Sequence, residues 1–150
     1  METKCVDAWA SLELDSASNV KICCMSEHTL FNDHLGNISL DSYLDSPVLK
    51  EIKEYMLAGK WHPNCQRCQI EEEAGRSSKR IRDNKTFSGW DEIGEKLQQP
   101  VFLDLKLGNK CNLNCRICDT GSSSASVPER LFFASDKEKS QINDLQNKIK

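Results

Sequence analysis

Three cysteines lie within eight residues of one another, directly after an apolar run of the chain. They are Cys111, Cys115 and Cys118, in the stretch NKCNLNCRIC, and their spacing is C-x3-C-x2-C. A [4Fe–4S] cluster has four irons, and each iron takes one ligand from outside the cluster. Three thiolates would leave the fourth iron open, as a catalytic zinc keeps one position for a small molecule. The spacing therefore indicates a [4Fe–4S] cluster with an open iron.

Two alternatives remain for this loop. Zinc is the rival metal, but zinc sites usually join two separated short-spaced pairs of ligands, which three cysteines in one loop do not provide. Structural cysteines without a metal are the other alternative. The chain has eight cysteines. In a reducing cytoplasm such a number favours metal binding or catalysis over disulfides.

Composition and charge restrict the partners and the compartment. The net charge of −3 and the pI of about 5.6 argue against nucleic acid as the main partner. No apolar run approaches the roughly 20 residues of a membrane span. The N-terminal METKCVDAWAS lacks the apolar core of a signal peptide. We expect a cytoplasmic protein without a membrane or nucleic-acid partner.

A strand leads into the three-cysteine loop. The stretch VFLDLKL (101–107) alternates strictly, and it places Val101, Leu103, Leu105 and Leu107 on one face. Alternation of this kind is typical of a β-strand. The cysteines therefore follow the end of a strand, where a loop can present several side chains together.

A β-hairpin is predicted near the N-terminus. Residues 9–15 alternate, residues 19–24 are rich in β-branched side chains, and SAS between them supplies turn chemistry. The hairpin places Cys5 just before one strand and Cys23 at the end of the other, at neighbouring ends of an antiparallel pair. LGNI (35–38) predicts a turn.

The clearest helix covers residues 46–59. Ser46 can cap it, Pro47 suits its first turn and Gly59 can end it. Its apolar stripe is expected to face the core, and it consists of Val48, Leu49, Ile52, Tyr55 and Met56.

The remaining segments carry weaker signals. Residues 65–82 are expected to begin as a loop and continue as a helix, with Gly75 as a weak point. The basic stretch 76–82 follows three glutamates, which predicts a solvated helix face. Residues 86–100 are interpreted as a connector that ends at a proline. The charged tail from Pro128 onward is a helix candidate, because Ile142, Leu145 and Ile149 lie at helical spacing.

VFLDLKLGNKCNLNCRIC resembles the start of a radical S-adenosylmethionine (radical SAM) core. Asn109, Asn112 and Asn114 around the cysteines and the serines at 122–124 add to the resemblance. It implies that the amino and carboxylate groups of S-adenosylmethionine bind the open iron. An electron, from a donor such as flavodoxin or ferredoxin, then splits this cofactor to a radical that abstracts hydrogen from the substrate. Ile117 departs from the family, which usually has an aromatic residue before the third cysteine.

The first 80 residues carry a second resemblance, to the twitch or SPASM auxiliary-cluster domains. In these domains one cysteine precedes a hairpin, one ends it, and a later C-x2-C pair completes the set. The resemblance implies that Cys5, Cys23, Cys65 and Cys68 bind an auxiliary iron–sulfur cluster in a closed site with four thiolates. Cys24 is the alternative to Cys23.

Two further positions lie close to these elements. His62, close to Cys65, could bind a metal, but it is expected to be a surface histidine. Ser18 stands in the hairpin turn, where the family often has glycine.

Together these observations predict an α+β protein with two parts. Residues 1–95 form a small twitch/SPASM-like domain of hairpin and helix, and residues 96–150 the first strand and cluster loop of a partial (β/α) barrel. A full barrel takes roughly 250 residues, and only 32 residues follow Cys118. We expect the core to be incomplete, with the rest of the barrel in a continuation or on a second chain.

The function implied is that of the N-terminal part of a radical SAM enzyme, which modifies a peptide or protein substrate. The chain alone is expected to be too short for full activity, and we assign no catalytic side chain. The alternative is a non-enzymatic iron–sulfur binding or electron-transfer module. The cofactors implied are S-adenosylmethionine and [4Fe–4S] clusters, of which two are expected.

Overall fold

A small sheet lies at the centre of the fold, in a computed structural model that describes residues 2–30 and 39–149. Within these residues it has three strands, in the order β2-β1-β3. β1 (Ser11–Leu14) pairs antiparallel with β2 (Val20–Lys21) and parallel with β3 (Phe102–Leu105). The fold is therefore mixed α and β, as predicted, and it contains both the expected hairpin and the expected strand before the three-cysteine loop.

The hairpin turn is stabilised by its own polar groups. The backbone N–H of Asp15 donates to the carbonyl of Asn19 at 3.0 Å, and the Asp15 carboxylate accepts from the backbone N–H groups of Ala17 and Asn19 at 2.9 and 3.0 Å. Ser18 has φ +63°, a left-handed conformation that favours glycine. This geometry explains why glycine would suit the position at which this chain has serine.

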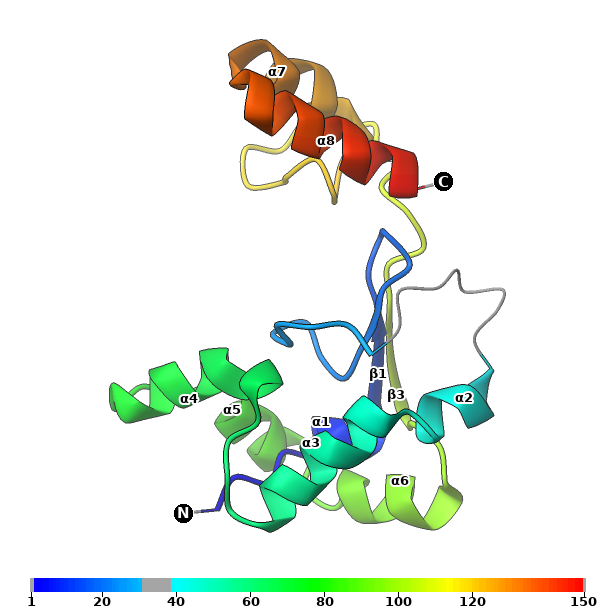
Figure 1. The fold of residues 1–150 in the computed structure, drawn as a ribbon, viewed down its shortest axis with the longest axis vertical. Helices are drawn as coiled ribbons and strands as arrows, with labels where there is room; N and C mark the ends of the chain where they lie inside the picture. The colour runs from blue at the N-terminus through cyan, green and yellow to red at the C-terminus, as the bar shows by residue number, and fades with distance from the viewer. Residues whose placement is uncertain (1, 31–38, 150) are drawn as a thin grey trace.

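Helices surround the lower part of the sheet in Figure 1. The described elements of this part are α1 (Asp7–Ala10), α2 (Leu40–Leu44), α3 (Pro47–Leu57), the 3-10 helix η2 (Pro63–Cys65), α4 (Gln66–Glu73), α5 (Lys79–Thr86) and α6 (Trp90–Leu97). The turn expected at 35–38 lies outside the described residues.

Helix α3 agrees with the sequence in its caps and its buried face. The Ser46 hydroxyl accepts from the backbone N–H of Leu49 at 3.4 Å, and Gly59 ends the helix with φ +68°. Three residues of the predicted stripe are buried, and they are Leu49, Ile52 and Met56. They pack with apolar residues of α1 and the hairpin in one core, and the half-buried Val48 packs against it. Tyr55 is 36% exposed, so the prediction of a core-facing side chain was wrong for this residue.

Two segments differ from their predicted conformation. Residues 63–73 are helical from the start, as η2 and α4, rather than beginning as a loop. The connector predicted at 86–100 contains helix α6, which packs against α1. A Cβ on Gly94 would lie 2.3 Å from the Trp9 carbonyl oxygen, so the absence of a side chain allows the close approach of α6 to α1.

The basic stretch 76–82 is only partly a solvated face. Arg80 in α5 is 9% exposed, and its guanidinium forms a bidentate pair with Glu72 of α4. Arg82, by contrast, is exposed, as predicted. Arg80 therefore ties α4 to α5 across the break at Gly75, and the prediction of solvation was wrong for this side chain.

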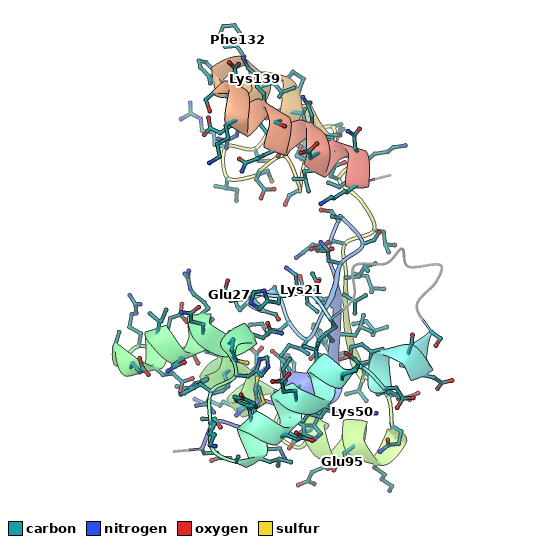
Figure 2. The ribbon with its side chains drawn as sticks, in the orientation of Figure 1. Lys21, Glu27, Lys50, Glu95, Phe132 and Lys139 are labelled. Carbon is teal, nitrogen blue, oxygen red and sulfur yellow. The ribbon has the colours of Figure 1, made fainter. Side chains whose placement is uncertain are left out.

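The C-terminal part forms a separate lobe at the other end of the molecule (Figure 1). It comprises the three-cysteine loop, the 3-10 helix η3 (Ser124–Ser126), α7 (Val127–Phe133) and α8 (Asp136–Lys148). The predicted C-terminal helix is thus present as α8, which begins with a capping box of Ser135 and Glu138. In Figure 2, Phe132 and Lys139 mark this lobe, far from Lys50 and Glu95 at the opposite end.

A helix that spans a bilayer must be both long and apolar. Within residues 2–30 and 39–149, no helix is both long and apolar enough to span a membrane.

Candidate functional site

Four cysteines from distant parts of the chain line one small cavity. Cys5 precedes α1, Cys23 follows β2, Cys65 ends η2 and Cys68 lies in the first turn of α4. The cavity has a volume of about 20 Å³. Cys24 does not line it, and its exposed side chain lies in the wall of a neighbouring cavity. The fold thus groups Cys23, and not Cys24, with the other three thiols.

A network of hydrogen bonds holds the segment after Cys23 against the turn before Cys65. The Asn64 side-chain oxygen accepts from the backbone N–H of His28 at 3.2 Å, and its carbonyl accepts from the N–H of Glu27 at 3.2 Å. The backbone N–H of Cys65 donates to the His62 carbonyl at 2.8 Å. These contacts position two of the four thiols.

His62 is not the surface histidine that was predicted. It is 7% exposed, and its Nδ1 accepts from the backbone N–H of Asn64 at 3.1 Å. Burial lowers the pKa of its imidazole, although the nearby Glu51 opposes this effect. Since His62 is not among the residues that line the four-thiol cavity, its role is to shape the turn that carries Cys65.

A buried amide in the cavity wall lacks a partner. Asn64 lines the cavity and is 2% exposed, and its Nδ2 has no hydrogen-bond partner among the residues that the structure describes. An unsatisfied buried donor costs about 1–3 kcal/mol. A thiolate or an inorganic sulfide in the cavity would accept a hydrogen bond from it. The donor is therefore of the kind that suits an iron–sulfur cluster.

Burial keeps the free thiols of Cys5, Cys23 and Cys65 protonated. Burial raises the pKa of Cys65 to about 12, and it also raises the pKa values of Cys5 and Cys23, with a further contribution from the charge of Asp7. A bound metal must displace these protons, because thiolates are the ligands. The guanidinium of Arg80 lies in the cavity wall, where its positive charge favours thiolates.

Four thiolates are the ligand set of a closed [4Fe–4S] cluster. In the described parts of the chain, no group of three or more His, Cys, Asp or Glu side chains could hold a metal ion as they stand. A [4Fe–4S] cluster binds each thiolate to a different iron, so its ligands stand farther apart than those of one zinc. The donors fit a cluster in number and type. Since a cavity of about 20 Å³ holds only about one water, a cluster requires the lining side chains to separate.

The three-cysteine loop is more open. Cys111 and Cys115 are exposed and Cys118 is half-buried. Cys115 and Cys118 line a cavity of about 400 Å³ beside α7, whereas Cys111 does not. The Cys111 Sγ instead accepts from the backbone N–H of Leu113 at 3.4 Å. The structure thus brings two of the three predicted ligands to one cavity, and the third lies apart on the same loop.

The serines after the loop hold its backbone. The N–H of Ser124 donates to the Asn109 carbonyl at 2.7 Å, and the Ser124 hydroxyl accepts from the N–H of Cys111 at 3.3 Å. The Ser123 hydroxyl donates to the Leu113 carbonyl at 2.8 Å. Both ends of the loop are therefore fixed while its thiols stay accessible.

Asparagines complete this support. Asn109 is buried, and its amide donates to the Thr120 carbonyl at 2.9 Å and to Gln146 of α8 at 2.9 Å. Asn114 donates to the Glu129 carboxylate of α7 at 2.9 Å. Ile117, at the position before the third cysteine, is 96% exposed. In the described structure this side chain packs against almost nothing.

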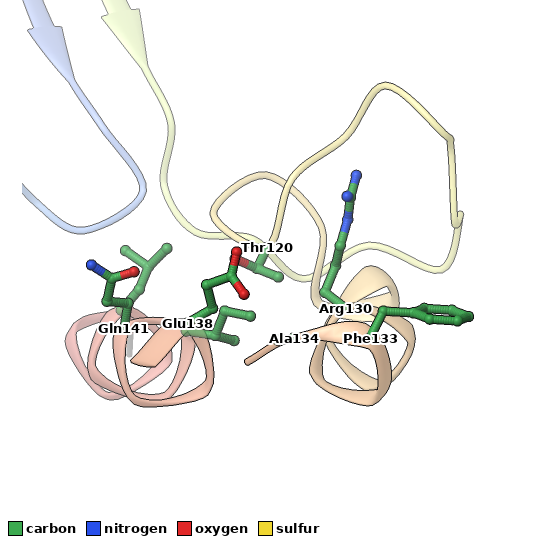
Figure 3. A pocket seen from close by; sticks show the side chains of 8 residues that line it. Thr120, Arg130, Phe133, Ala134, Glu138 and Gln141 are labelled. Carbon is green, nitrogen blue, oxygen red and sulfur yellow. The ribbon is translucent and has the colours of Figure 1, made fainter. Parts of the chain in front are cut away.

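A further cavity lies between α7 and α8, and the sequence carried no motif that could have indicated it. It has a volume of about 400 Å³, and in Figure 3 Glu138 and Gln141 project from α8 while Arg130 and Phe133 project from α7. Arg130 and Phe133 also line the cavity beside Cys115. The two cavities therefore adjoin at α7, and the Arg130 side chain lines both of them.

Comparisons with protein-family models, with curated proteins and with solved structures found no match for this chain.

Proposed function

We propose that this chain is the N-terminal part of a radical S-adenosylmethionine enzyme that modifies a peptide or protein. Cys111, Cys115 and Cys118 would hold a [4Fe–4S] cluster with an open iron. When bound, S-adenosylmethionine and the reduced cluster supply hydrogen-atom abstraction. The proposal also includes a closed auxiliary cluster in a twitch/SPASM-like domain.

The observation that carries the proposal is the four-thiol cavity. Cys5, Cys23 and the pair Cys65 and Cys68 come from three segments and line one cavity, together with Asn64, whose amide Nδ2 is unpartnered among the described residues. Four thiolates close a site, so the auxiliary cluster would relay electrons or stabilise the fold.

The chain's own residues near the open cluster would bind the cofactor. The cavity of about 400 Å³ beside Cys115 and Cys118 is also lined by Arg116 and Arg130. A guanidinium pairs well with a carboxylate such as that of a methionine group. Asn114, fixed by its hydrogen bond to Glu129, lies in the same wall.

Anaerobic reconstitution with iron and sulfide tests the cluster content. We expect about eight irons per chain, in two clusters of about four irons each. Cys115→Ala should remove one cluster and Cys65→Ala the other, while Cys24→Ala serves as the matched control and should keep both. Stoichiometric zinc without charge-transfer absorption would refute the cluster assignment. Loss of a cluster from Cys24→Ala, but not from Cys23→Ala, would reverse the choice of ligand.

Titration of the reduced protein with S-adenosylmethionine tests the open iron. The electron paramagnetic resonance signal of the cluster at Cys111, Cys115 and Cys118 should change, and the auxiliary signal should not. Cys65→Ala and Cys115→Ala separate the two signals. An unchanged spectrum at saturating cofactor, with both clusters present, would instead favour the electron-transfer module.

A further inference from the structure

A cavity of about 200 Å³ adjoins the four-thiol cavity and carries an excess of negative charge. Four carboxylates line it, those of Asp7, Glu13, Asp83 and Asp104, against the single cation of Lys79. The Lys79 ammonium is already engaged by Asp7, at 2.7 Å, and by Asp83. Lys79 is therefore fully engaged by these two carboxylates, and Glu13 and Asp104 share the charge of one other lysine, Lys106.

Glu13 is the buried part of this acidic wall. Its side chain is 3% exposed, and Lys106 binds its Oε1 at 2.8 Å. Its Oε2 is buried and has no hydrogen-bond partner among the described residues. A buried carboxylate oxygen without a donor is costly, more so than a neutral group. Since Glu13 lines the cavity, a ligand bound there is a candidate donor to this oxygen.

The register of the sheet adds a second carboxylate at the same place. Glu13 of β1 lies directly opposite Asp104 of β3, and both side chains line the cavity. Like charges directly opposite on neighbouring strands are destabilising. Lys106 offsets part of this repulsion through its ion pair with Glu13 Oε1. A second cation between Glu13 and Asp104 would offset the rest and supply the missing donor to Oε2.

The remaining wall indicates the kind of cation. Phe87 and Phe102 line the cavity as a stacked pair, with ring centroids 5.7 Å apart. Aromatic rings suit an alkyl stem and attract an organic cation. A metal ion fits less well, because the described residues contain no group of three or more side chains that could hold one.

We propose that this cavity binds a primary alkylammonium group, such as the side chain of a lysine residue. The ammonium would donate to Glu13 Oε2 and Asp104, and its methylene stem would lie along Phe87 and Phe102. The inference goes beyond the proposed function and needs neither cluster, because every group that it uses belongs to the sheet and α5 or follows α5 directly.

Nuclear magnetic resonance titration of the full chain tests the site, with Nα-acetyl-lysine methylamide as the probe and its norleucine counterpart as the uncharged control. We expect the lysine probe to shift the amide signals of Glu13 and Asp104, and the norleucine probe to leave them unchanged. Glu13→Gln keeps the shape and removes the charge. It should weaken binding about 10-fold, equivalent to about 1.4 kcal/mol, through loss of a charge-assisted hydrogen bond.

Two further variants keep the result interpretable if Glu13→Gln fails to fold. Asp104→Asn alters a half-buried side chain and should also weaken binding, whereas Asp45→Asn removes an exposed charge elsewhere and should not. Equal binding of the norleucine probe would overturn the proposal. So would wild-type affinity in both Glu13→Gln and Asp104→Asn, or displacement of the lysine probe by stoichiometric Mg²⁺.

Discussion

Replacement of Arg80 by glutamine tests how the four-thiol cavity is held together. The Arg80 Nε and Nη2 donate to the Glu72 carboxylate at 2.9 and 2.6 Å, and its Nη1 donates to the Lys4 carbonyl at 3.0 Å. The guanidinium carbon also lies 5.3 Å from the centroid of the Trp61 ring. Arg80 thus joins α4, α5 and the segment before Cys5.

The expected cost lies between those of exposed and fully buried ion pairs. Exposed pairs contribute about 0–1 kcal/mol, and breaking a fully buried pair costs about 3–5 kcal/mol. The side chains of Arg80 and Glu72 are each 10% exposed, and Ser78 still donates to Glu72 after the change. We therefore expect Arg80→Gln to destabilise the fold by about 2–3 kcal/mol. At about 2–4 °C per kcal/mol, Tm should fall by about 4–12 °C.

Thermal and urea unfolding, followed by circular dichroism, measure this effect. Arg67→Gln is the matched control, because Arg67 forms an exposed pair with Glu71 in α4 and should change stability by less than about 0.5 kcal/mol. Arg80→Lys should give an intermediate loss, since lysine keeps the charge but not the bidentate geometry. If Arg80→Gln unfolds at the same temperature as Arg67→Gln, the reasoning about this ion pair is refuted.

Two other predictions concern packing and pH. Gly94→Ala places a Cβ 2.3 Å from the Trp9 carbonyl oxygen. The cost of overpacking, about 1–3 kcal/mol, should outweigh the gain of about 1 kcal/mol in helix propensity. Urea unfolding measures the difference, with the exposed Glu95→Ala as control, and a Gly94→Ala variant more stable than the wild type would contradict this prediction. Burial tends to raise the pKa of Glu72, but hydrogen bonds from Arg80 and Ser78 hold it below its ordinary value of 4.5. The ionised carboxylate therefore stabilises the fold at neutral pH, and this contribution is lost as the pH falls below 4.5. Glu72→Gln should flatten the fall in stability in that range, and an unchanged slope in melts at several pH values would argue against the pair.

Local patterns in the sequence determined the elements whose formation depends on near neighbours. The alternation in 101–107 predicted β3, and Ser46, Pro47 and Gly59 predicted the start and end of α3, because caps and strand periodicity act within a few residues. The helical spacing of Ile142, Leu145 and Ile149 predicted a helix, and α8 covers the first two and ends directly before Ile149. The order of the cysteines along the chain led to the assignment of Cys5, Cys23, Cys65 and Cys68 as ligands of an auxiliary cluster. The fold brings these four to one cavity, and their role as ligands remains a prediction.

Tertiary contacts decided what the sequence could not show. Helix α6 was missed because its contact with α1 depends on Gly94 meeting a backbone that is distant along the chain. Arg80 and His62 were expected in solvent because local charge patterns do not reveal a partner such as Glu72 or a buried turn. The opposition of Glu13 and Asp104 arises only from the parallel pairing of β1 with β3. Such pairings join residues far apart in the sequence, and only the folded chain sets their register.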